Sequence, residues 1–166
     1  MKVRWNQGML NALGGDPEFL EPSVLPIPEH LNRLLAEGFE QNRGCILLRS
    51  LASSKSSVLP NLKDDETGIE AFINHIHLED FVSPDVSFFE LARLGRDFGF
   101  ALRTRLGEEQ LSGPFRVIVS ARAADPASDG VHDTCVVRFH KRRPNQPWLD
   151  DELESYRDEA IAVMDF

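Results

Sequence analysis

The chain has 166 residues, of which 42% are hydrophobic and 27% charged, as in an ordinary soluble globular protein. Its 18 basic and 27 acidic residues give a net charge of −9, which argues against direct binding of nucleic acid or anionic lipid, because both are polyanions. No apolar run approaches about 18 residues and the first residues lack a secretory signal, so we expect a cytoplasmic protein without a membrane anchor.

The chain, residues 1–166, is expected to form one globular domain that begins with an irregular arm over residues 1–28. This arm contains four prolines and three glycines, and such residues remove backbone donors or resist ordering. It also contains several large apolar residues. We therefore expect the arm to pack on the body of the domain.

Three helices are predicted after the arm. Pro28 suits the first turn of a helix over residues 28–41. A second helix starts near Asp64 or Asp65, whose carboxylates complement the positive helix end, and finishes at His75. The third opens at Ser83 and carries apolar residues on one side as far as Leu102.

Four segments read as strands. Residues 115–122 and 134–141 are rich in β-branched residues and form a predicted hairpin. Residues 159–165 supply a late strand, and the apolar run 45–51 supplies an earlier one. The sequence therefore predicts an α+β fold, with a mostly antiparallel sheet of about four strands and about three helices packed on one face.

The acidic end of the chain is its most distinctive feature. The last 23 residues carry seven carboxylates and one arginine, directly after the basic run 138–143. They also contain tryptophan and tyrosine, which protein interfaces favour as anchors. The candidate partner-binding residues are Trp148, Asp150, Asp151, Glu152, Glu154 and Tyr156. Two interpretations stay open: the carboxylates meet a basic partner, or they pair within the fold while the aromatic residues dock the segment on the sheet.

The predicted hairpin offers an alternative, anion-binding site. Its candidate residues are Arg116, Arg138, His140 and Arg142. Arginine forks hold phosphate or carboxylate groups at two points, and a histidine beside cations tends to stay neutral and able to act as a base. A plainer interpretation is that these basic residues form ion pairs with the acidic end of the chain.

No catalytic residue, cofactor or metal site is predicted. Phosphate-binding, zinc-protease and serine-hydrolase motifs are all missing from the sequence. His75 and His77 could share a cation on a strand, but on a helix they would point apart. Cys45 and Cys135 lie in apolar runs and read as small buried hydrophobic residues with free thiols.

These patterns favour a non-catalytic domain that binds a basic protein partner. In general character the chain is similar to bacterial immunity proteins and antitoxins, which implies a nuclease-like toxin as that partner. One alternative is a small enzyme or ligand-binding domain that uses the basic hairpin and His140 on an anionic metabolite. Another is a structural or assembly subunit that oligomerises through the proline-rich arm.

Overall fold

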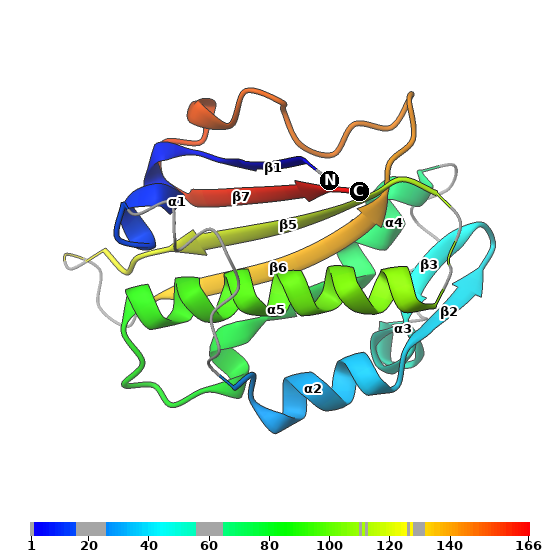
Figure 1. Cartoon of the computed structure of the whole chain (residues 1–166), viewed down its shortest axis with the longest axis horizontal. Coiled ribbons are helices and arrows are strands. Elements are labelled where there is room, and N and C mark those ends of the chain that lie inside the picture. Colours follow the sequence, from blue (N-terminus) through cyan, green and yellow to red (C-terminus); the bar gives the residue numbers. More distant parts are fainter. Residues whose placement is uncertain are drawn as a thin grey trace.

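The computed structural model has an antiparallel sheet of five strands at its centre, in the order β1-β7-β5-β6-β4 (Figure 1). It describes residues 2–15, 26–55, 65–109, 111, 113–125, 127 and 132–166. The five strands are β1 (Lys2–Trp5), β4 (His75–His77), β5 (Phe115–Arg122), β6 (Thr134–Lys141) and β7 (Ala160–Asp165). Together with its helices, this sheet makes the fold α+β, as predicted.

The hairpin of β5 and β6 forms the middle of the sheet, and both strands have the predicted bounds. Its register places Phe115 opposite Lys141 and Arg122 opposite Thr134. Strand β7 begins at Ala160, close to its predicted start, and pairs with the other edge of β5. The β-branched residues of these strands fit a pleated, buried surface, which is why the sequence pattern located them.

Helix α5 (Phe88–Glu108) lies across one face of the sheet (Figure 1). It begins later than predicted because its start signal is a capping box, in which Ser87 accepts from the backbone of Glu90 and the Glu90 carboxylate accepts in return. Gly95 lets the helix approach the sheet closely, since a Cβ atom there would collide with the sulfur of Cys135. The helix continues without a break past both of its central glycines.

The main core lies between α5 and the sheet. Its fully buried members include Leu91, Phe98, Leu102, Val117, Val119, Val137 and Phe139. The four strand residues in this set stand two positions apart along β5 and β6, so one face of each strand is buried here.

Helix α2 (Glu29–Ala36) is shorter than the predicted helix over residues 28–41. The helix ends there because Gly38 takes a φ of 72°, a left-handed conformation that a helix cannot continue through. Residues Phe39–Asn42 then form strand β2.

The apolar run 45–51 is also divided. Only β3 (Cys45–Leu48) is a strand, and it pairs with β2 in a separate two-stranded sheet instead of joining the central one. Helix α3 (Arg49–Lys55) follows at once. The turn between β2 and β3 has positive φ at both Arg43 and Gly44, the conformation that matches the twist of a tight hairpin.

Helix α4 (Glu66–Ile73) confirms the prediction of a start near Asp64 or Asp65, and the cap is Asp65, whose carboxylate accepts from the backbone of Gly68 at 2.8 Å. It ends before His75, which lies in β4. The described residues thus form five α-helices, including α1 (Gln7–Ala12), where about three were expected. No helix within the described ranges is both long and apolar enough to cross a membrane.

The start of the chain is more regular than predicted. Within the expected arm, β1 pairs with β7, so that Lys2 stands opposite Asp165 at the edge of the sheet. Asn6 then caps α1 by accepting from the backbone of Met9 at 2.9 Å. A local sequence pattern does not show the pairing of β1 with β7. This pairing makes part of the arm regular, where its prolines and glycines had suggested an irregular backbone. Residues 16–25 of the expected arm lie outside the described residues.

Candidate functional site: the charged face and its acidic strap

The face of the sheet opposite α5 carries most of the predicted functional residues, and we call it the charged face. Because side chains alternate along a strand, Arg116 and Ile118 point away from the core residues of β5. The register places Arg116 opposite His140 and Ile118 opposite Arg138. Arg142 follows directly after β6. All four residues of the predicted anion-binding set therefore belong to this face or its border.

The acidic segment 144–158 forms a strap on the charged face, and Figure 1 shows it running back alongside β1. A small apolar cluster joins the strap to the sheet, and its members are Ile118, Leu149, Leu153, Tyr156, Ile161 and Val163. Helical structure in the strap is limited to one 3-10 turn, Leu153–Ser155. The strap is thus docked through its apolar residues, as one interpretation of the sequence proposed.

The two aromatic residues of the strap have different surroundings. Tyr156 joins the apolar cluster, and its hydroxyl accepts a hydrogen bond from the backbone N–H of Asp150 at 3.0 Å. Trp148 stays 39% exposed and lines two neighbouring hollows. Only Trp148 of this pair presents a large aromatic surface outward.

The four predicted carboxylates of the strap also divide into two groups. Asp151 forms ion pairs with Arg4 at 3.0 Å and Arg116 at 3.3 Å. The hydrogen bond from Arg4, followed by the charges of both arginines, lowers the pKa of Asp151. Asp150, Glu152 and Glu154 are exposed and have no ion pair with any described residue. Glu154 accepts a hydrogen bond from the backbone N–H of Gln7, the first residue of α1, at 2.9 Å. Among the described residues, only Asp151 of the four carboxylates is therefore neutralised by a cation.

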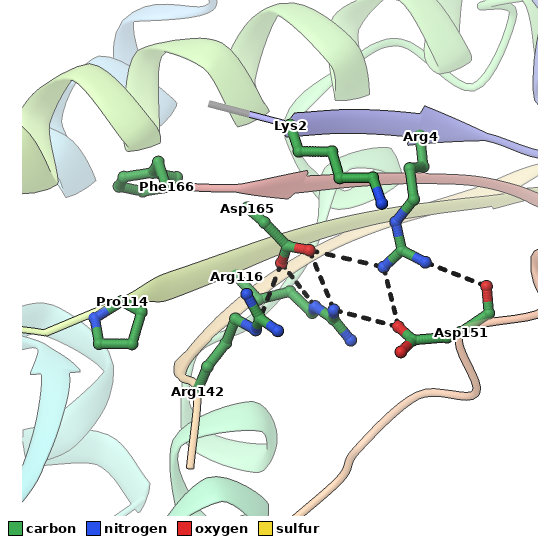
Figure 2. A pocket seen from close by; sticks show the side chains of 8 residues that line it. All are labelled: Lys2, Arg4, Pro114, Arg116, Arg142, Asp151, Asp165 and Phe166. Atoms are coloured by element: carbon green, nitrogen blue, oxygen red, sulfur yellow. Dashed lines mark hydrogen bonds and ion pairs between the residues drawn. The ribbon is translucent and has the colours of Figure 1, made fainter. Parts of the chain in front are cut away.

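Arg116 and Asp165 are the centre of a charged cluster that borders a hollow of about 550 Å³ (Figure 2). Two hydrogen bonds, of 2.7 and 3.0 Å, join the Arg116 guanidinium to the Asp165 carboxylate. These bonds raise the pKa of Arg116. Burial raises the pKa of Asp165, but the hydrogen bond and charge of Arg116 outweigh it and hold that pKa below its usual value. The pair stays ionised at neutral pH.

His140 lies beside this cluster and is 2% exposed. Its Nδ1 stands 3.1 Å from the carbonyl oxygen of Lys141, so Nδ1 donates and Nε2 carries the lone pair. Nε2 is buried and has no hydrogen-bond partner in the described chain. Burial, with the charges of Arg116 and Arg143, lowers the pKa of His140 to about 4. The imidazole is therefore neutral at physiological pH, and burial contributes more to this than the neighbouring cations.

A family model matches residues 4–166 and is described as the uncharacterized protein PM0498 family. The chain belongs to this family. No curated protein and no solved structure matches it. The matched range contains the strap and every member of the charged cluster except Lys2.

Arg138 is separated from the other predicted anion-binding residues of this PM0498-family chain. It borders a different hollow, of about 500 Å³, together with Ser120 and Glu159. Burial lowers the pKa of Arg138. In contrast, Arg116, His140 and Arg142 line one shared hollow of about 510 Å³. The structure thus brings three of the four residues together.

His75 and His77 lie on strand β4, so the prediction that His75 ends a helix is wrong. Both point to the charged face, and their rings stack with centroids 4.6 Å apart. His77 Nδ1 is 2.7 Å from a carboxylate oxygen of Glu79. Among the described residues, no three potential ligands are grouped as a metal ion would require.

Three members of the charged cluster were missed at the sequence level: Lys2, Arg4 and Asp165. They come from the two ends of the chain and meet only because β1 pairs with β7. The alternation of Lys2, Val3 and Arg4 could have indicated this cluster, because it places two cations on one face of a strand.

Proposed function

We propose that this protein is a non-catalytic binding domain of the immunity or antitoxin type, whose acidic strap covers a basic, nuclease-like toxin. The observation that supports this most directly is the set of three exposed strap carboxylates that form no ion pair with any residue the structure describes: Asp150, Glu152 and Glu154. The exposed ring of Trp148 lies in the same strap. Exposed negative charge without a cationic partner among the described residues, next to an aromatic anchor, suits recognition of a cationic surface.

The strap is held in one position before any partner arrives. Leu153 packs on the sheet, the Tyr156 hydroxyl binds the backbone of Asp150, and Asp151 is fixed by Arg4. A surface that is ordered in advance loses less conformational entropy when it binds. The internal pairing of Asp151 thus supports the proposal by orienting its unpaired neighbours.

Long-range electrostatics favour the same class of partner. The net charge of −9 attracts a basic protein and accelerates encounter. A nuclease is a natural basic partner, because its own substrate is a polyanion. The contact with nucleic acid would then be made by the partner and not by this protein.

A cytoplasmic location is part of this proposal. Cys45 and Cys135 are both buried and unbridged, as suits a reducing compartment. Burial raises the pKa of Cys45 to about 11 and raises that of Cys135 further. Neither thiol is thus poised to act as a nucleophile.

The test is a titration of the full chain against a basic protein that co-purifies with it. Replacing Asp150, Glu152 and Glu154 together by lysine should weaken binding roughly 100-fold, at about 1 kcal/mol for each reversed charge. The matched control reverses Glu40, Asp80 and Asp85, which lie outside the strap and change the net charge equally. Equal losses in both triple variants, or no binding by the wild type, would reject the proposal.

A further inference from the structure

The hollow in Figure 2 contains more positive than negative charge. Its lining includes four cationic side chains, Lys2, Arg4, Arg116 and Arg142, and two carboxylates, Asp151 and Asp165. Figure 2 shows the four cationic side chains converging around Asp165 from β1, from β5 and from the segment after β6. The two side-chain carboxylates leave an excess of two positive charges.

The internal carboxylates hold two of the four cationic side chains, Arg4 and Arg116. Arg4 donates to the carbonyl oxygen and the carboxylate of Asp151 and, at 3.5 Å, to Asp165. Arg116 is 7% exposed and donates to both Asp165 and Asp151. Arg142 is 47% exposed and meets Asp165 only at 3.8 Å. Lys2 is exposed and has no ion pair with a described residue. Donors of two cationic side chains, Lys2 and Arg142, therefore remain available to a ligand.

We propose that this hollow binds a dianionic oxyanion, namely a phosphate group, either free or carried by a small phosphomonoester. A phosphate dianion suits a lining in which cationic side chains outnumber side-chain carboxylates, and it does so more fully than a single carboxylate. Guanidinium forks and an ammonium bind tetrahedral oxygens from several directions, and such charge-assisted hydrogen bonds are stronger than neutral ones. The site is independent of the proposed protein partner.

An ester has room beside the phosphate position. The hollow of Figure 2 and the one next to His140 share Pro114, Arg116, Arg142 and Asp151 in their linings. A phosphate held by the cluster could thus extend its organic part toward Trp148. The same chemistry accommodates free phosphate without this second contact.

Asp151 opposes this ligand. Its carboxylate shares Arg4 and Arg116 with the hollow, and it lies on the strap, with 77% of the side chain exposed. The negative charge of this carboxylate repels an anion bound to the same arginines, so Asp151 lowers the affinity of the site for phosphate. Removing the charge of Asp151 must therefore tighten phosphate binding, while removing a cation must weaken it.

The experiment is calorimetric titration of the full chain with inorganic phosphate at pH 7.5, with chloride added to keep the ionic strength constant. Arg142→Gln should lower the affinity about tenfold, the loss typical of a charge-assisted hydrogen bond. The control Arg33→Gln removes the same charge from α2, where the side chain is 61% exposed and paired with Glu29, and should change the affinity less than twofold. Undetectable phosphate binding, or equal effects of the two variants, would overturn the proposal.

A second variant should change the phosphate affinity in the opposite direction. Asp151→Asn should tighten phosphate binding about threefold to tenfold, and circular dichroism should confirm that it is folded; weaker or unchanged binding would overturn the site. Glycerol 3-phosphate in a parallel titration separates the two sources of the phosphate group. Tighter binding of the ester supports a phosphomonoester, and tighter binding of inorganic phosphate supports the free ion. The phosphate titrations and the partner titration can fail independently of each other, because the partner titration leaves Asp151 unchanged.

Discussion

The two faces of the central sheet are built from the same strands and have opposite characters. Under α5, residues such as Val137 and Phe139 are fully buried in one continuous apolar core. On the charged face, Arg138 and His140 alternate with them along the same strand. There the apolar packing is confined to the small cluster beneath the strap. The comparison shows that the face under α5 supplies most of the apolar packing that stabilises the fold. The charged face can therefore hold charged groups without weakening that core.

The largest expected effect is a pH dependence that originates on the charged face. The pKa of His140 falls from 6.5 in the unfolded chain to about 4 in the folded one. Between these values the unfolded chain binds a proton that the folded protein refuses, so stability falls as the pH drops from 6.5 to 4 and this contribution is constant below that. The loss is about 3 kcal/mol.

Urea unfolding at pH 7 and pH 4 measures it. The wild type should lose about 3 kcal/mol more than His140→Gln across this interval, since the carboxylates titrate in both proteins. His30→Gln, an exposed change on α2, should behave like the wild type. Parallel pH profiles for wild type and His140→Gln would show that burial does not keep this imidazole neutral.

The next effect compares the two faces at adjacent positions of β6. Val137 is fully buried against α5, and Val136 is 9% exposed beside a hollow on the charged face. Val137→Ala should cost about 2.5 kcal/mol, from lost transfer energy and a cavity, whereas Val136→Ala should cost about 1 kcal/mol. Chemical denaturation gives both values. Equal costs would mean that the faces are equally well packed.

The smallest effect concerns the strap. Tyr156→Phe removes the hydroxyl that accepts from the backbone of Asp150, and it should cost about 1 kcal/mol or less. Amide hydrogen exchange should nevertheless speed up at Asp150, with β6 amides unchanged. Full protection of Asp150 in this variant would show that the apolar cluster alone fixes the strap.

Local pattern was sufficient for some elements and not for others. Strands β5 and β6 and the Asp65 cap could be predicted, because β-branched runs and capping residues act over a few positions. Strand β1 was missed, since its pairing with β7 joins the two ends of the chain. The prediction of a single strand over residues 45–51 in the central sheet was wrong. A hairpin turn with two positive φ angles pairs the first part of this run with β2 in a separate sheet.

The candidate site shows the same limit. Alternation along the hairpin brought Arg116 and His140 together, and composition alone marked the acidic strap. Which carboxylate is neutralised depends on Arg4, which is 147 residues from Asp151 in the chain. Only the three-dimensional pairing of distant segments decides that Asp151 forms an ion pair and that Glu152 forms none with a described residue.

The neighbouring positions of the first and last strands have a practical consequence. Figure 1 shows the two chain ends side by side, and Lys2 stands opposite Asp165 in the sheet. A purification tag fused at either end would emerge next to the cationic hollow. Histidine or acidic tags could then imitate or block a ligand, so binding measurements call for cleaved protein or for a label placed on α2.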